Sequence, residues 1–203
     1  MIAIITGDIV NSRQVADTKK WLSVLKSALN IIDKNNWEIY RGDSFQLKTR
    51  VEDALMQAIY IKTCIKTIKD LDIRIAIGIG KQEYEAEKVS YSNGEAFIFS
   101  GDTLEMLKKE KVNLAIQSPS ADFNEEINVA IRLALTFMDG WSVVTAGIVK
   151  AALENSSLSQ QELAAKIGKT QSSVSEALKR AHFAEVKELD ALYRKKVMQL
   201  DSK

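Results

Sequence analysis

The sequence has very little of the residue types on which several common kinds of site depend. Its 203 residues include one cysteine, one histidine and one proline, which excludes a disulfide framework and argues against a zinc site. Cys64 shares a helical pattern with Ile61, Ile65 and Ile68, which is typical of a core thiol.

Long apolar runs are missing as well. No run approaches the roughly 18 residues of a membrane span. The first residues form a strand pattern, without the basic start and small-residue cleavage site of a signal peptide. We therefore expect a cytoplasmic protein that does not insert into membranes.

An excess of charge of one sign is also absent. The formal net charge is +1, from 28 basic and 27 acidic residues, so the overall charge does not indicate a nucleic-acid partner. Any contact with DNA would have to come from a local patch of lysine or arginine. The 46% hydrophobic content is sufficient for one large domain or two small ones.

Strand and helix patterns alternate over the first 80 residues. Amphipathic helices are predicted over residues 17–34 and 51–69. Strands are predicted over residues 2–10, 37–40, 44–48 and 73–79. This order is that of a ferredoxin-like fold, in which two helices cover one face of a four-stranded antiparallel sheet.

The pattern is less regular over the next 40 residues. Residues 81–93 are polar and are expected to form a mobile loop. Residues 94–102 leave open whether a helix begins or ends there. Residues 103–109 favour a helix, and residues 113–117 favour a short strand.

The only proline, Pro119, marks the predicted domain boundary, because serine and proline interrupt the pattern and the periodicity changes afterwards. We predict a ferredoxin-like domain over residues 1–121 and an all-helical domain over residues 122–203. The helical domain ends in a long helix marked by Phe183 and Tyr193.

Two aspartates are predicted to meet at one end of the sheet. Asp8 ends the first strand, and Asp43 follows Gly42 in the hairpin, where the turn explains the glycine better than the aspartate. In the ferredoxin-like order the first and third strands are antiparallel neighbours, which brings the two carboxylates together. Magnesium prefers carboxylate oxygens completed by water and phosphate, so the pair predicts a site for a divalent cation or a nucleotide phosphate.

An alternative applies to each of these residues taken singly. An aspartate at a strand end is most often a cap or turn residue. Arg13, Arg41 and Lys48 are candidates for contact with phosphate, but such residues are more often solvated.

Residues 159–180 meet the requirements of a helix-turn-helix. Ala164 is small where the helices cross, Gly168 tolerates positive φ, and Thr170 is a suitable N-cap. Val174 and Leu178 supply an apolar inner face. The remaining polar residues are those predicted to contact DNA: Lys169, Thr170, Gln171, Ser172, Ser173, Ser175, Lys179 and Arg180.

The alternative for this segment is a purely structural helical hairpin, which obeys the same packing rules. Glu162 and Glu176 offset the nearby lysines, so DNA affinity is expected to be modest unless the protein forms a homodimer. The final helix is a candidate for that dimer contact.

Four segments together resemble the SatD family of bacterial proteins across essentially the whole chain. They are IITGDIVNSR at residues 4–13, YRGDSF at 40–45, RIAIGIG at 74–80 and GEA at 94–96. More distantly, residues 1–118 are similar to the palm domain of class III nucleotidyl cyclases and diguanylate cyclases.

The resemblance to the cyclase palm implies a magnesium ion held by Asp8, Asp43 and the backbone carbonyl of Ile9. It also implies that neighbouring residues contact the nucleotide, namely Asn11, Ser12, Arg13, Arg41, Gly42 and Ser44. The cyclase helix that follows the glycine at position 94 normally carries an asparagine and, four residues on, an arginine that stabilises the transferring phosphate. Ile98 and Asp102 stand closest to those places, and an aspartate there would repel the phosphate.

The sequence thus predicts an α+β protein in which a ferredoxin-like, nucleotide-cyclase-like palm precedes an all-α helix-turn-helix domain. Its predicted function is that of a transcriptional regulator whose palm senses a nucleotide with magnesium and whose second domain binds DNA. Two alternatives remain. One is a metal-dependent nucleotidyl cyclase or nucleotidyltransferase, and the other is an interaction protein with a degenerate palm.

Overall fold

The computed structural model describes residues 1–12, 18–40 and 42–200, which form an α+β protein around a five-stranded mixed sheet. The strands are β1 (Ile2–Val10), β2 (Trp37–Tyr40), β3 (Ser44–Thr49), β4 (Asp72–Gly80) and β5 (Leu114–Gln117). Their order in the sheet is β2-β3-β1-β4-β5. The strand β1 is antiparallel to both neighbours, whereas β5 is parallel to β4. The expectation of four antiparallel strands is therefore corrected, because the short strand at 114–117 joins the edge of the sheet.

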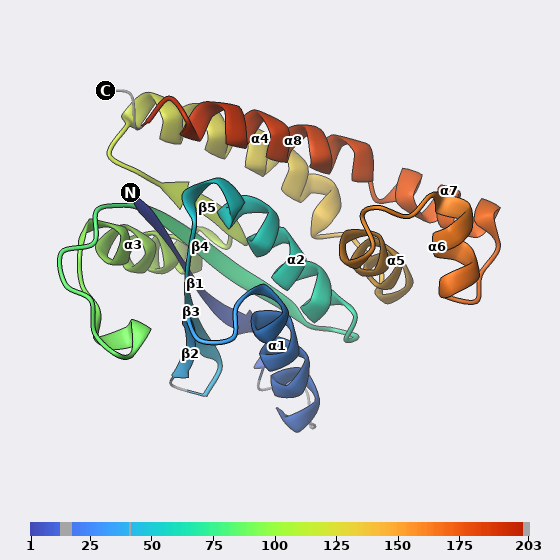
Figure 1. Ribbon diagram of the computed structural model, residues 1–203, viewed down its shortest axis with the longest axis horizontal. Coiled ribbons are helices and arrows are strands. Elements are labelled where there is room, and N and C mark those ends of the chain that lie inside the picture. The colour runs from blue at the N-terminus through green and yellow to red at the C-terminus, as the bar shows by residue number, and fades with distance from the viewer. Residues whose placement is uncertain (13–17, 41, 201–203) are drawn as a thin grey trace.

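Helices cover both faces of this sheet (Figure 1). The helices α1 (Thr18–Ile32) and α2 (Ala54–Lys66) share a core with Ile5, Phe45 and Ile75, and a 3₁₀ turn at Val51–Asp53 precedes α2. The helix α3 (Glu95–Glu110) packs on the opposite face, where Ile4 and Ala76 point. Successive strand residues alternate between faces, which is why one sheet serves both layers.

The glycines at positions 78 and 94 explain how α3 reaches the sheet. A Cβ at Gly78 would lie 2.1 Å from the carbonyl oxygen of Ala96, so the backbone of α3 rests directly on β4. Gly94 has φ 144° and immediately precedes the helix, so the segment 94–102 begins a helix. The residues before it form a 3₁₀ turn at Val89–Tyr91 and a bridge between Tyr84 and Asn93, which gives the predicted loop some structure.

Five helices follow the sheet: α4 (Ala121–Met138), α5 (Val143–Glu154), α6 (Gln160–Lys166), α7 (Gln171–Arg180) and α8 (Phe183–Val197). The helix α4 packs against β5, and α8 runs along α4 (Figure 1). The pair α6 and α7 lies at one end of the molecule against α5. None of the described helices has the length and apolar character needed to cross a membrane.

Two asparagines of α4 cover the outer edge of β5. The side chain of Asn128 accepts from the N–H of Ile116 at 2.8 Å and donates to its carbonyl at 2.7 Å. One helical turn earlier, Asn124 makes the same two bonds with Ser118, each at 2.8 Å. The spacing of a helix turn nearly matches that of alternate strand residues, so two side chains replace a neighbouring strand.

The hydrophobic core runs through both ranges of the predicted domain division. Phe123 and Tyr193 of the helical range belong to the same cluster as Ile5 and Leu55 of the sheet range. The Tyr193 hydroxyl donates to the carbonyl of Val51 at 2.5 Å. The division at residue 121 stays a prediction, and the two parts share one apolar interior.

The apolar face of α8 is also part of this interior. Val186, Leu189 and Tyr193 are buried against the same chain. A dimer contact through the final helix would therefore have to use its exposed side, which carries Leu192.

Candidate functional site

Asp8 and Asp43 lie together at one end of the sheet. Asp8 is the register partner of Ser44, and the N–H of Ile9 donates to the carbonyl of Asp43 at 3.1 Å. The charge of Asp43 reaches Asp8, where it helps to raise the pKa of the carboxyl group. The strand pairing thus brings together the two aspartates that the sequence singled out.

The Asp8 carboxylate already has two cationic partners. Arg74, its register partner on β4, places Nη1 3.0 Å from Oδ1 and 3.3 Å from Oδ2. Lys108 of α3 places Nζ 3.7 Å from Oδ2. The Asp8 side chain is only 13% exposed, and this burial is the largest influence on its pKa, which stays raised although Arg74 and Lys108 lower it.

Asp43 is positioned by the hairpin turn. Gly42 has φ 85°, in the left-handed region that favours glycine, and Ser12 Oγ donates to Asp43 Oδ2 at 2.8 Å. Asn11 also has a positive φ, of 64°, and is exposed beside the end of β1. Ser44 is half-buried and is the register partner of Asp8, and the nucleotide contacts implied by the resemblance stay a prediction.

The other residues predicted to contact phosphate lie in different surroundings. Arg13 and Arg41 lie outside the described residues. Lys48 lies 2.5 Å from Glu85, so its charge is used in an ion pair on the surface. Ile98 and Asp102 of α3 are both exposed.

Arg74 and Lys108 were not foreseen from the sequence. The sequence pattern could have indicated Arg74, because it is a charged residue within the otherwise apolar strand 73–79. No sequence pattern could have indicated Lys108, because its approach to Asp8 depends on how α3 docks on the sheet.

The four charged side chains fit a magnesium-bound phosphate better than a bare metal ion. Both cations lie at Asp8, and Lys108 also lies 2.6 Å from Glu105, so the Asp8 carboxylate is already paired within the chain. A metal at Asp8 would have to displace Arg74 or Lys108, whereas a phosphate arriving with the metal would offer both cations a new partner. Among the described residues, no three His, Cys, Asp or Glu side chains gather into a metal site of their own.

The pair α6 and α7 has the local geometry expected for residues 159–180. Gly168 has φ 65°, and Thr170 caps α7 by accepting from the N–H of Ser173 at 3.2 Å. Ala164 is buried where the helices meet, and Val174 is fully buried on the inner face. A capping box between Ser159 and Glu162 starts α6.

The outer face of α7 is polar and accessible. Of the residues predicted to contact DNA, Ser175 is half-buried and the others are exposed: Lys169, Thr170, Gln171, Ser172, Ser173, Lys179 and Arg180. Glu176 shares this face, and Arg180 lies 3.6 Å from it in a solvent-exposed ion pair of little energy. The basic side chains are thus partly offset, as the composition suggested.

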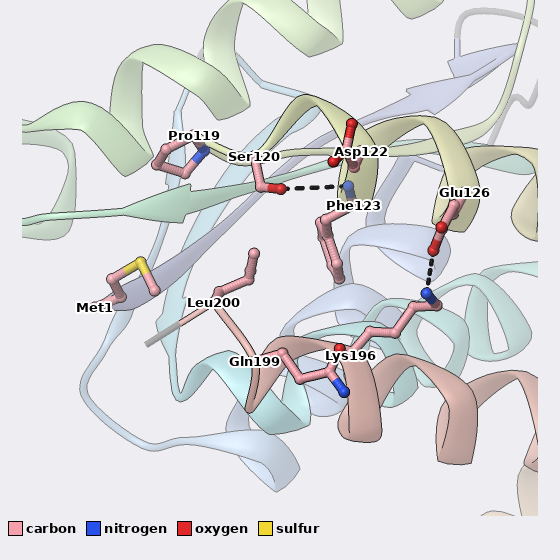
Figure 2. Close-up of a pocket in the computed structure, with 9 residues that line it drawn as sticks. All are labelled: Met1, Pro119, Ser120, Asp122, Phe123, Glu126, Lys196, Gln199 and Leu200. Carbon is pink, nitrogen blue, oxygen red and sulfur yellow. Dashed lines mark hydrogen bonds and ion pairs between the residues drawn. The ribbon is translucent and has the colours of Figure 1, made fainter. Parts of the chain in front are cut away.

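A cavity of about 480 Å³ lies elsewhere, between the start of α4, the end of α8 and Met1. Figure 2 shows Phe123 and Leu200 facing each other across it, with an ion pair between Glu126 and Lys196 beside them. Met1 precedes β1 and Asp8 lies near its other end, so this cavity is separate from the aspartates.

Comparison with known protein families matches residues 1–188 to the family described as SatD. The chain belongs to the SatD family. The match covers the sheet, the aspartates, α6, α7 and the first part of α8. No curated protein and no solved structure matches this SatD family member.

Proposed function

We propose that this SatD family member is a DNA-binding transcriptional regulator. The observation that carries the proposal is the exposed polar face of α7, which follows a glycine turn and a capped N-terminus and has its apolar side packed inward. A recognition helix requires this combination, because its N-terminal residues must reach base edges while the partner helix holds it in place. A helical hairpin with a purely structural role requires the same inward packing. It does not require the run of short polar residues at the exposed N-terminus of α7.

A mobility-shift titration on DNA from upstream of the protein's own gene tests this proposal. The double variant Gln171→Ala with Lys179→Ala should bind at least about tenfold more weakly, since it removes one contact of base-reading type and one phosphate contact. Lys195→Ala on the exposed side of α8 is the matched control and should leave the shift unchanged. Equal binding by the double variant would favour the structural hairpin.

We further propose that the sheet half is a ferredoxin-like palm that senses a nucleotide with magnesium. The order β4-β1-β3-β2, with α1 and α2 on one face, supports this relation. The cluster of Asp8, Asp43, Arg74 and Lys108 supports the ligand, because carboxylates suit the metal and cations suit the phosphates. A nucleotide that binds one arrangement of the chain more tightly than another would shift DNA affinity by that difference.

Calorimetry with a panel of nucleoside triphosphates and magnesium tests the sensor. Asp43→Asn should weaken binding at least about tenfold, because a carboxylate ligand to the metal is lost. Asp122→Asn, exposed at the start of α4 and far from the two aspartates, is the matched control. If no nucleotide binds, the palm is not a nucleotide site, and the interaction-protein alternative gains support.

The variant Lys108→Met distinguishes the contribution of Lys108 to metal binding from its contribution to phosphate binding. Removal of the competing cation should strengthen binding of magnesium alone and weaken binding of the magnesium nucleotide. Equal effects on both ligands would contradict the assignment of Lys108 to the phosphate.

A nucleotidyl cyclase or nucleotidyltransferase is the second candidate, and Lys108 is the observation that favours it. The sequence lacks the arginine expected on the helix after Gly94, but Lys108 brings a positive charge from that same helix to Asp8. Release of pyrophosphate from the bound nucleotide would identify the enzyme. Binding without release would identify the sensor.

A further inference from the structure

The helix α1 has one buried side and one basic, polar side. Trp21, Leu25 and Leu29 face the core. The residues that recur at helical spacing on the opposite side are exposed, and we call them the lysine face. They are Lys19, Ser23, Lys26, Ser27, Asn30 and, two residues beyond the end of α1, Lys34. A surface groove follows α1 along the first five of them.

The three lysines of this face are available to an external partner. Residues 18–32 contain no acidic residue. Asp33 follows them, and its Oδ1 accepts from two backbone N–H groups, at 2.7 and 2.9 Å, where the helix ends. Lys19, Lys26 and Lys34 form no ion pair with another residue that the structure describes. The chain as a whole has a net charge of +1, so the remainder would be negative without these three lysines.

Side chains of this kind suit a phosphate backbone. Lysine supplies charge, and serine and asparagine donate hydrogen bonds to phosphate oxygens, as they do in protein–DNA complexes. Lys19 and Lys26 are separated by about two helical turns, or about 10 Å along the helix axis, so each meets a different phosphate. A basic stripe along a helix is the electrostatic footprint of nucleic-acid binding.

An anionic membrane fits this face less well. A helix that lies on a membrane inserts its apolar side into the lipid. The apolar side of α1 is instead buried in the core that it shares with the sheet and α2. Within α1, every residue of which is described, Ile31 is the only exposed large apolar side chain. Phosphate contact at the surface is therefore favoured over insertion into lipid.

We propose that the lysine face binds the phosphate backbone of duplex DNA without reading its sequence. Figure 1 shows α1 apart from α6 and α7, so this surface is separate from the proposed recognition helix. Glu176 partly offsets the basic residues of α7, whereas the lysine face adds charge that strengthens binding to any sequence. The choice of DNA among polyanions rests on the proposed function, and the phosphate contact itself rests on the lysine face alone.

Fluorescence anisotropy of the full chain with a labelled random-sequence DNA duplex, measured over a series of salt concentrations, tests this proposal. The double variant Lys19→Gln with Lys26→Gln should bind at least about tenfold more weakly at low salt, because two phosphate contacts are lost. For the same reason, the slope of the logarithm of affinity against the logarithm of salt concentration should fall by about two. Glutamine has a helix propensity similar to that of lysine, so α1 itself is kept.

The matched control is the double variant Lys109→Gln with Lys195→Gln. It makes the same change of charge at exposed positions of α3 and α8, and it should leave both the affinity and the salt slope unchanged. Equal salt slopes for the lysine-face and control variants would refute the proposal. Tighter binding of the wild type to an RNA duplex or to phosphatidylserine vesicles than to the DNA duplex would also refute it.

The same measurement on DNA from upstream of the protein's own gene separates this proposal from sequence reading by α7. The lysine-face variant should weaken binding to the upstream and random duplexes by the same factor, whereas Gln171→Ala should weaken binding to the upstream duplex alone. If α7 does not read DNA, the preference for the upstream duplex is absent, but the loss caused by the lysine-face variant remains. Either proposal can therefore fail without the other.

Discussion

At the scale of single residues, the surroundings of each carboxylate determine what it can do. Asp8 and Asp190 are both buried aspartates, and burial raises the pKa of each. Both oxygens of Asp8 face cations, so a ligand must replace an existing partner. Burial raises the pKa of Asp190, whereas Arg194 Nε, 2.7 Å from Oδ2, and the N–H of Met56 lower it, so this carboxylate joins α8 to the start of α2.

Cys64 allows a prediction about reactivity. The thiol is 1% exposed, and burial raises its pKa from its ordinary 9.0 to about 11. A thiol reagent at pH 8 should therefore modify Cys64 only after denaturant unfolds the chain, which a colour assay of released thiolate can follow. Rapid labelling of the native protein would contradict this environment.

The raised pKa of Cys64 also predicts that the stability of the folded chain depends on pH. The folded state holds the thiol proton more tightly than the unfolded state, so this contribution is fully present below about pH 9 and is lost as the pH rises towards about 11. Urea denaturation across that range should show the loss in the wild type. Cys64→Ala should lack this component.

At the scale of elements, the turn between α6 and α7 depends on backbone conformation alone. Gly168 has φ 65°, and a Cβ there would meet no atom within 4 Å. Gly168→Ala should therefore cost about 1 kcal/mol from backbone strain without a clash. Gly101→Ala is the matched control, because Gly101 lies within α3 with equally open space, and it should stabilise the chain by about 0.5–1 kcal/mol. Melting temperatures that shift in the same direction for Gly168→Ala and Gly101→Ala would contradict this assignment.

The edge of β5 supports a second prediction at this scale. Asn128→Ala leaves the N–H and carbonyl of Ile116 without their side-chain partner, which should cost about 1–3 kcal/mol in urea denaturation. An uncovered edge also pairs readily with other strands, so light scattering should detect self-association. Val129→Ala, on the exposed side of α4, should change neither measurement. A variant as stable and monodisperse as the wild type would show that the pairing contributes little.

At the scale of the whole molecule, an ionic cluster around the buried Lys62 connects the sheet to the helical range. Lys62 of α2 is 1% exposed and lies 2.6 Å from both Asp72 and Asp139, at the start of β4 and the end of α4. Lys66 donates to the carbonyl of Asp139 at 2.6 Å. With the shared apolar core, these contacts lead us to expect that the chain unfolds as one unit.

Lys62→Met tests this connection. Removing the ammonium takes the charge partner from Asp139, which is 38% exposed, and leaves Asp72 with Lys66, so the variant should cost about 1–3 kcal/mol. Fluorescence and circular dichroism in urea should still report one coincident transition. Lys69→Met, exposed near the end of α2, should shift the midpoint little. Two separated transitions in the wild type would instead support independent domains.

Periodicity and turn chemistry made much of the chain predictable from its sequence. Contacts between near neighbours determine the strands, the two helices over one face, and the cap and turn of residues 159–180. The meeting of Asp8 with Asp43 followed from strand order. These features needed only the local pattern and one topological rule.

Other features depended on tertiary structure, because they join residues that no local pattern relates. Arg74 reaches Asp8 across 66 positions, and Lys108 does so only because α3 docks on the second face. The pairing of Asn124 and Asn128 with β5 likewise depends on how separate elements pack. The sequence by itself determined which residues carry charge and where the elements begin. Packing decided which charges are paired, since burial and distance set the strength of each interaction.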